Sequence, residues 1–390
     1  MKFLCASDSF KGSISSKRIC QLFKQAVYSV FPGCEVIGIP IADGGEGTVE
    51  AVVQITGGRY ETVRVAGPLA EPVDAIYGTF GGNCAIIEMA AASGLPLVPP
   101  SQRNPLHTTS YGTGELIRDA LEKGCRTLYI SLGGSATNDG GMGALRALGV
   151  QFFDKAGQPL TGTGADLIRA AAIDTSALHP AIAECDIRIL CDVNNPLTGK
   201  NGAVYTFGKQ KGATPEILEQ LECGMCSYAQ LLHTVTGINA DSITGAGAAG
   251  GLGAAFHIFL NAPLQSGLET ILELMQFNRL LDGVDLVVTG EGCADGQSIL
   301  GKVPSGIGKR CKARGIPAVM ITGSIGEGAE ALYEYGIESI MPLVDSPMSL
   351  QEALERAEEL YVNAATRLLR LIQSGMKIKR YRGGSGGSPA

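Results

Sequence analysis

Apolar residues recur along the chain in two spacings that predict alternating strands and helices. Residues 2–6 form a short apolar run typical of a strand, and the apolar positions from 19 to 30 recur every three or four residues, as in a helix. A second strand is predicted at 34–41 and a second helix at 49–55. The chain therefore opens as strand, helix, strand, helix.

The same alternation returns at the C-terminal end. Strands are predicted at 285–289, 316–322 and 337–343, with helices at 304–315 and 349–373. Such alternation is typical of a doubly wound parallel α/β sheet. Because both ends follow it and the middle is irregular, we expect the two ends to fold together around an inserted domain, with a cleft between the two.

The predicted boundaries follow from this division. One α/β domain is expected over 1–70 and 280–375, with part of 107–150 as a further candidate for it. An inserted second α/β domain is expected over 71–279, and 376–390 is predicted to be a tail or linker. The middle of the chain predicts paired strands within 60–80, strands at 84–90, 126–132 and 185–191, and helices at 111–123, 142–148 and 215–235.

The segment 126–149 changes from strand to glycine-rich loop to helix. Its loop contains the residues that we assign to the phosphates of a nucleotide: Gly133, Gly134, Ser135, Asn138 and Asp139. Glycines let the backbone approach a ligand, and free N–H groups at a helix N-terminus favour an anion. The alternative is a tight connection capped by Asn138 or Asp139, and the local sequence favours neither.

Acidic residues recur where predicted strands end. They are Asp8, Asp43, Glu46, Asp192, Glu291 and Asp295. Ligands of open α/β sheets bind beyond the carboxyl ends of the strands, and converging carboxylates hold a divalent cation or take up a proton. Each acid alone is most simply a cap or turn residue, but several beside glycines favour a site. Asp43 and Glu291 are the predicted Mg²⁺ ligands, directly or through water.

Three lysines lie in glycine-rich surroundings suited to phosphate: Lys11, Lys211 and Lys302. A lysine is more often a solvated surface residue, but glycine neighbours favour a ligand contact. Residues 296–302 fit G-x-x-x-x-G-K, yet Val303 follows where a P-loop needs Ser or Thr, so we reject a P-loop. The G-x-G-x-x-G at 245–250 lacks a strand-turn-helix context and is a weak dinucleotide signal.

Composition and charge limit the partners. Hydrophobic residues make up 45% and charged residues 18%, as in compact soluble enzymes. The net charge of −7 argues against nucleic acid, which needs a basic face. No apolar run approaches the roughly 20 residues of a membrane span. Since Asp8 also interrupts the N-terminus before a signal-peptide core could form, we expect a cytoplasmic protein without membrane contact.

Cysteine and histidine spacing does not indicate a metal centre. The 11 cysteines lie mostly in apolar contexts, which favours reduced, buried thiols. The C-x-x-C formed by Cys223 and Cys226 lies in a helical pattern without a second pair. The four histidines share no ligand spacing. We expect neither a zinc site nor a histidine metal site.

A series of segments resembles the bacterial glycerate kinase family, in the order in which the segments occur there. They are DSFKGS from Asp8, IADGGEGT from Ile41, IEMAAASGL from Ile87, YGTGELI from Tyr111, GGSATNDGG from Gly133, CDVNNPL from Cys191, FGKQKGA from Phe207, GAGAAGGLGAA from Gly245 and TGEGCADGQSILGKVPSG from Thr289. The resemblance implies phosphorylation of D-glycerate with ATP and Mg²⁺, in the subgroup that forms 2-phosphoglycerate. It also implies a flavodoxin-like domain joined to a smaller, swivelling α/β domain.

Phosphoryl transfer depends mostly on positioning and charge stabilisation, and we assign roles on that basis. The loop 133–141 would hold the nucleotide phosphates. Lys11 would stabilise charge on the transferred group, with Lys211 as a second candidate. Asp192 would accept the proton of the glycerate hydroxyl or orient that hydroxyl.

Two positions depart from the family pattern. The family commonly has Pro where this chain has Lys209 and Arg where it has Cys293. If that Arg holds phosphate or the glycerate carboxylate, we hypothesise that Lys209 compensates for its loss.

Two other classes of protein are weighed against a kinase. An NAD-dependent hydroxy-acid dehydrogenase would use the glycines at 245–250, which lie in the wrong context. A non-catalytic small-molecule binding protein would share the two-domain cleft, but it would have no need for so many acids at strand ends.

Overall fold

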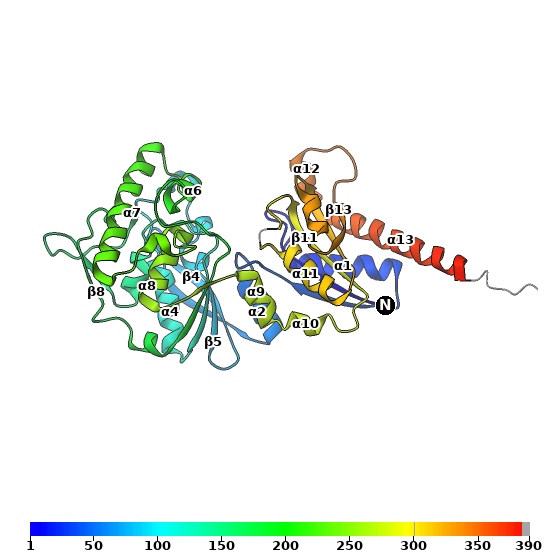
Figure 1. Ribbon diagram of the computed structural model, residues 1–390, viewed down its shortest axis with the longest axis horizontal. Coiled ribbons are helices and arrows are strands. Elements are labelled where there is room, and N and C mark those ends of the chain that lie inside the picture. The colour runs from blue at the N-terminus through cyan, green and yellow to red at the C-terminus, as the bar shows by residue number, and fades with distance from the viewer. Residues whose placement is uncertain (300, 384–390) are drawn as a thin grey trace, which may run out of the picture. The chain divides into compact units, whose positions relative to one another are not determined.

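The computed structural model describes residues 1–299 and 301–383. The chain divides into two compact units (Figure 1): unit 1 comprises Met1–Asp43 and the chain from Gln276 onward, and unit 2 is Gly44–Met275. Both ends therefore contribute to one unit. The division falls at residue 43, earlier than the expected 70, and all of 107–150 lies in unit 2.

Unit 1 is built on a five-stranded sheet. Its strands are β1 (Lys2–Ser7), β2 (Glu35–Pro40), β11 (Leu286–Ala294), β12 (Ala318–Ile325) and β13 (Ile337–Pro342). They lie in the order β13-β12-β11-β1-β2 and every neighbouring pair is parallel. Numbered within the unit, this is 2-1-3-4-5, the flavodoxin-like order. The order reverses between β1 and β11, where such sheets bind ligands.

Helices cover both faces of this sheet. They are α1 (Ser16–Val30), α10 (Phe277–Leu280), α11 (Val303–Arg314), α12 (Leu350–Glu355) and α13 (Ala357–Gly383), with a 3-10 turn at Ala329–Tyr333. Figure 1 shows α1 and α13 side by side, and both contribute to one apolar core with Phe3 and Val288. Leu4 and Val287 alternate with those residues and are buried toward the other face, where α11 packs.

Two elements of unit 1 differ from the prediction. The predicted helix 349–373 is interrupted at Arg356, and α13 then runs to Gly383, so residues 376–383 of the predicted tail are helical. Residues 384–390 lie outside the described part of the chain. β11 continues past the predicted end at 289, because Glu291 and Cys293 pair with β12. Glu291 therefore lies within a strand and does not follow it.

Unit 2 contains a six-stranded sheet. Its strands are β3 (Arg59–Ala66), β4 (Pro72–Phe80), β5 (Cys84–Glu88), β6 (Thr127–Ser131), β9 (Asp186–Leu190) and β10 (Leu264–Gln265), in the order β10-β9-β6-β5-β4-β3. The strands from β10 to β5 are parallel, whereas β4 and β3 are antiparallel to their neighbours. β7 (Gln151–Phe153) and β8 (Ala172–Asp174) form a separate antiparallel pair.

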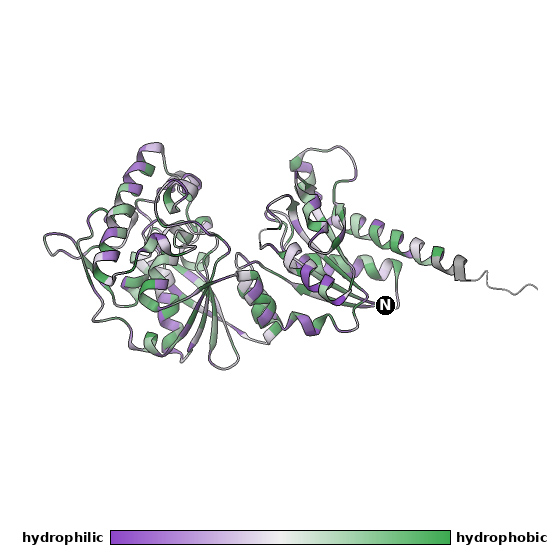
Figure 2. Ribbon diagram, viewed as in Figure 1, coloured by the Kyte–Doolittle hydropathy of each residue, from purple (hydrophilic) through white to green (hydrophobic). Residues whose placement is uncertain are grey.

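The helices of unit 2 are α2 (Thr48–Thr56), α3 (Ala90–Ser93), α4 (Tyr111–Glu122), α5 (Met142–Ala147), α6 (Ala203–Phe207), α7 (Pro215–Thr236), α8 (Leu252–Leu260) and α9 (Gly267–Leu274). Helices α3 to α8 contribute to one apolar core, whereas α2 and α9 contact each other and strands of the sheet. Figure 2 shows polar and apolar residues interspersed along α7, as expected for a helix with one buried face. The predicted α/β class is confirmed. Among the described helices, none is long and apolar enough to cross a bilayer.

Candidate active site

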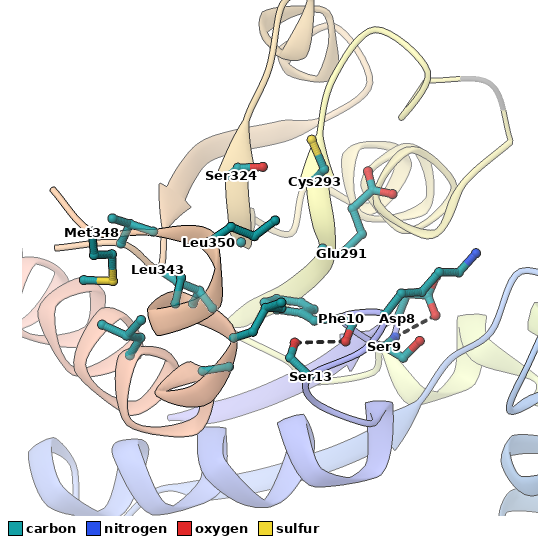
Figure 3. Close-up of a pocket in the computed structure, with 18 of the residues that line it drawn as sticks. Asp8, Ser9, Phe10, Ser13, Glu291, Cys293, Ser324, Leu343, Met348 and Leu350 are labelled. Atoms are coloured by element: carbon teal, nitrogen blue, oxygen red, sulfur yellow. Dashed lines mark hydrogen bonds between the residues drawn. The ribbon is translucent and has the colours of Figure 1, made fainter. Parts of the chain in front are cut away.

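A cavity of about 480 Å³ opens in unit 1 beside the switch point of the sheet. Its charged lining comes from Asp8, Lys11, Asp43, Glu291 and Lys302. Three of the residues predicted from sequence, Lys11, Asp43 and Glu291, are thus brought together. Figure 3 shows Asp8 and Glu291 on one side of this pocket and Leu343, Met348 and Leu350 on the other.

Local backbone geometry explains why Asp8 and Lys11 reach the pocket. The Asp8 N–H donates to the Gly290 carbonyl at 3.0 Å, which ties the end of β1 to β11. The chain then turns tightly, with the Phe10 N–H donating to the Ile14 carbonyl at 2.8 Å. Gly12 occupies this turn with φ of 78°, a conformation that other residues rarely adopt. The turn leaves Lys11 exposed at the pocket wall.

The carboxylates in the pocket repel one another. Burial, followed by the negative charges of Asp43 and Glu291, raises the pKa of Asp8 to about 7. The Ser9 N–H, which donates to Asp8 Oδ1 at 2.6 Å, and the Lys11 ammonium oppose this rise in pKa. Asp8 is therefore held in an electrostatic environment that favours a bound proton or an added cation.

Glu291 is anchored at the same site. Its side chain is 7% exposed, and Oε2 lies 3.2 Å from Lys302 Nζ. The Ser298 hydroxyl donates to the other carboxylate oxygen. Burial raises the pKa of Glu291, while the Ser298 hydrogen bond and the Lys302 charge counteract the rise. Lys302 is itself one-third exposed, so its ammonium remains within reach of a ligand.

The donor set is suited to Mg²⁺ that is shared with substrate phosphates. Within the described residues, no three His, Cys, Asp or Glu side chains form a ready-made metal site. Mg²⁺ at phosphoryl-transfer sites needs only one or two carboxylates, because phosphates and water complete its shell. The mutual repulsion of Asp8, Asp43 and Glu291 would be relieved by such a cation. These residues therefore fit the metal.

In unit 2, Asp139 is held by hydrogen bonds within the protein. Its fully buried carboxylate accepts hydrogen bonds from the Ser110 N–H and hydroxyl at 2.7 Å, the Gly141 N–H at 3.1 Å and the Gly143 N–H at 3.3 Å. The Ala144 N–H donates to the Ser110 hydroxyl at 3.0 Å. The N–H groups expected to attract a phosphate are thus taken up by the protein's own carboxylate and hydroxyl. The Asp139 side chain thus serves the start of α5 as a hydrogen-bond acceptor, and its contact with phosphate stays a prediction.

Asn138 and Lys211 are also turned into the interior of unit 2. Asn138 is fully buried and its amide donates to the Ala203 carbonyl at 3.3 Å. Lys211 is 2% exposed, and its ammonium donates to the Thr137 carbonyl at 2.6 Å. Burial lowers the pKa of Lys211 to about 7, with the nearby Asp139 charge acting in the opposite direction. Both side chains thus support the loop through buried hydrogen bonds, and their contacts with phosphate stay predictions.

The other predicted residues of unit 2 differ in their exposure. Gly134 is exposed and Gly133 is half-buried, while Ser135 pairs with Gly94 in an isolated bridge and is 8% exposed. Asp192 follows β9, is exposed, and its Oδ1 accepts from the Gly267 N–H at the start of α9, at 3.1 Å. These positions leave the predicted contacts of Gly133, Gly134, Ser135 and Asp192 as predictions.

Two members of the charged pocket were not assigned a role from sequence. The sequence shows Asp8 as an acid at a strand end and Lys302 as a lysine between glycine-rich segments. Neither pattern identifies the residue that each of them lies beside in the fold. Asp8 comes near Glu291 because β1 and β11 are neighbouring strands, and Lys302 at the start of α11 forms an ion pair with Glu291. Of the two departures from the family pattern, Cys293 is exposed and lines this pocket, whereas Lys209 is exposed in unit 2.

Comparisons of the sequence and of the structure with known proteins all identify glycerate kinases as similar. The sequence profile of the glycerate kinase family matches residues 3–373. The glycerate kinase of Bacillus subtilis (strain 168) is 44% identical over 360 residues, which cover 92% of this chain and 94% of that relative. The glycerate 2-kinase of Escherichia coli (strain K12) is 41% identical over 378 residues, covering 97% and 99%. A crystal structure from Salmonella typhimurium LT2, described as a glycerate kinase 2, matches with a TM-score of 0.84 at 42% identity, covering 97% of this chain and 99% of that one.

Proposed function

The chain belongs to the glycerate kinase family, and from this premise we propose that it transfers the γ-phosphate of ATP to the 2-hydroxyl of D-glycerate. Family membership makes it a kinase. The nucleotide, the metal and the choice of hydroxyl belong to the proposal. The name of the Escherichia coli relative, glycerate 2-kinase, supports the 2-hydroxyl.

The observation that carries the proposal is the meeting of two lysines and three carboxylates in one pocket of unit 1. Phosphoryl transfer requires cations where charge develops on the phosphate oxygens, and carboxylates that can bring in Mg²⁺. Lys11 and Lys302 would supply the positive charge, and Asp43 and Glu291 would hold the metal. Mg²⁺, when bound, neutralises part of the charge on the β- and γ-phosphates.

The transfer also needs a proton acceptor. The hydroxyl oxygen of glycerate forms a bond to the γ-phosphorus, the bond from that phosphorus to the β-γ bridging oxygen breaks, and the hydroxyl proton leaves to a base. We assign this base to Asp192, which lies exposed after β9. Gly133, Gly134 and Ser135 stay proposed as backbone contacts to phosphate.

The direct test is a coupled assay of ADP release with D-glycerate, ATP and Mg²⁺, with the product identified by ³¹P NMR. We expect ADP release that requires glycerate and a 2-phosphoglycerate signal. A 3-phosphoglycerate signal would keep the kinase and reject the 2-hydroxyl. ADP release independent of glycerate, or no release from protein that binds ATP, would reject glycerate as the acceptor.

A further inference from the structure

The pocket of unit 1 has a second half whose chemistry the acceptor substrate does not explain. Opposite the charged residues it is lined by Phe10, Leu343, Val344, Met348, Leu350, Ala353, Leu354, Ala357 and Leu360. Glycerate has three carbons, each bearing oxygen, so it presents no apolar face. A pocket of about 480 Å³ is also of the size that holds a drug-sized ligand. The apolar half must therefore serve another group.

We propose that this apolar half binds the purine base of the nucleotide, with the phosphates directed toward Lys11 and Lys302. The inference rests on the proposed function in one respect, namely that the phosphoryl donor is a nucleotide. A nucleoside triphosphate joins a flat, largely apolar base to a highly charged chain, and the pocket has the same division. This complementarity of charge and hydrophobicity fixes which end of the donor lies where.

The helix α12 provides one wall of the base site. Leu350, Ala353 and Leu354 follow the i, i+3, i+4 spacing of one face of α12, and Ala357 is the first residue of α13, after the break at Arg356. The Ser349 hydroxyl accepts from the Glu352 N–H at 3.2 Å and so fixes where this helix begins. The small side chains of Ala353 and Ala357 leave space in the pocket that larger residues would fill, and Leu350 and Leu354 line the same pocket. A flat ring is the shape that such a space accepts.

Exposure of this wall supports a ligand as its cover. Leu350 is 76% exposed, Val344 38% and Leu354 37%, although all three line the pocket. Contiguous exposed apolar residues at a pocket rim are typical of a binding site. Met348 lies in the same wall, and its flexible thioether adapts to the faces of aromatic rings. Leu371 on α13 is comparably exposed, at 66%, but does not line the pocket, which makes it a matched control.

The test compares a ligand that has the base with one that lacks it. Titration calorimetry in the presence of Mg²⁺ would measure ADP and inorganic tripolyphosphate on the parent protein, on the double variant Leu350→Gln/Leu354→Gln, and on Leu371→Gln. We expect the double variant to bind ADP about 10- to 100-fold more weakly, because the apolar contact of both leucines with the base is lost. Tripolyphosphate affinity should be unchanged, and Leu371→Gln should behave as the parent does.

A second variant tests the base site by filling it. Ala353→Leu would fill the space on α12, and we expect weaker ADP binding with unchanged tripolyphosphate binding. ADP affinity that is unchanged in both pocket variants, or that falls only together with tripolyphosphate affinity, would overturn the inference.

The outcome is separable from that of the proposed function. Glycerate-dependent turnover with unaltered nucleotide affinity in the variants would reject the base site alone. Base-dependent loss of ADP affinity in a protein that never phosphorylates glycerate would reject the proposed acceptor alone.

Discussion

The charged residues of the two units lie in similar sequence patterns, but those of unit 1 line a pocket and those of unit 2 are buried. In unit 1, Asp8, Lys11 and Lys302 line an open pocket at the ends of parallel strands. In unit 2, Asp139 and Lys211 are buried. Asp139 accepts hydrogen bonds from Ser110, and Lys211 donates one to the Thr137 carbonyl. We infer that acids and lysines beside glycines indicate a ligand site where they line a pocket, and a structural role where the protein encloses them.

The energetic consequence of this difference is that the two groups should respond to mutation in different ways. The exposed pocket charges, which we propose to act on a substrate, should contribute little to folding, because exposed ion pairs are worth about 0–1 kcal/mol. Buried, hydrogen-bonded charges hold the loop of unit 2 in place, and their loss leaves unsatisfied donors. Activity and stability measured on the same variants separate the two groups.

The largest effect is expected at Asp192, an exposed acid of unit 2. Asp192→Asn removes the proposed base, so kcat should fall by about 10²- to 10⁴-fold with little change in melting temperature. Steady-state kinetics and thermal unfolding provide the two readings. Near-normal kcat would remove Asp192 from the mechanism and confine the reactive groups to unit 1.

Lys11→Met should lower kcat by about 10²- to 10³-fold, because one cation that stabilises the transferred phosphoryl group is lost. Its exposure means that the fold should be unaffected. Lys24→Met is the control, since Lys24 is exposed on α1, where its ammonium lies over the Tyr28 ring, and it does not line the pocket. Equal activity in the two variants would contradict the role of Lys11.

Asp139→Asn should act on stability. In the parent, the hydrogen-bond donors around Asp139 are divided between its two carboxylate oxygens, whereas an amide offers only one acceptor oxygen. The free energy of unfolding should therefore fall by about 1.5–3 kcal/mol. Denaturant titration measures the loss. If stability were unchanged while nucleotide affinity fell, Asp139 would be a ligand contact after all.

Lys211→Met should change the dependence of stability on pH. The folded-state pKa of Lys211 is about 7, below the 10.5 of an ordinary lysine, so the unfolded state binds more protons between these values. The parent therefore gains stability as pH rises from 7, and the Met variant lacks this gain. Between pH 7 and 8.5, we expect the stability difference to shift by about 1–2 kcal/mol in favour of the parent. Parallel stability curves would show that the buried amine does not titrate in this range.

The smallest effect is expected from Cys293→Arg, which restores the residue common in the family. A guanidinium on the pocket wall should lower the KM for ATP by about 2- to 5-fold, the effect of one exposed charge contact. Unchanged kinetics would remove position 293, and with it the compensation hypothesis for Lys209, from any account of phosphate binding.

Sequence periodicity was sufficient for the elements that place the pocket, because strands such as β1 and helices such as α1 are specified by local alternation of apolar residues. It was insufficient where a distant partner decides the outcome. The Asp139 carboxylate is satisfied by Ser110, 29 residues away, and no local pattern reveals that pairing. Likewise, Glu291 lies in a strand because β12 extends alongside it, which the five residues 285–289 cannot show.

The arrangement of unit 1 also has a consequence for biosynthesis. A ribosome makes β1 and β2 early, but β11, the other neighbour of β1, emerges only after the whole of unit 2. At about 5–20 residues per second, that delay lasts about 10–50 s, during which β1 has an unpaired edge. Unit 2 is continuous in the chain, so we expect it to fold first. Limited proteolysis of arrested nascent chains that end near residue 290 tests this order. We expect 44–275 to be protected and 1–43 to be cleaved. Protection of both segments would mean that 1–43 is shielded before β11 is available to pair with β1.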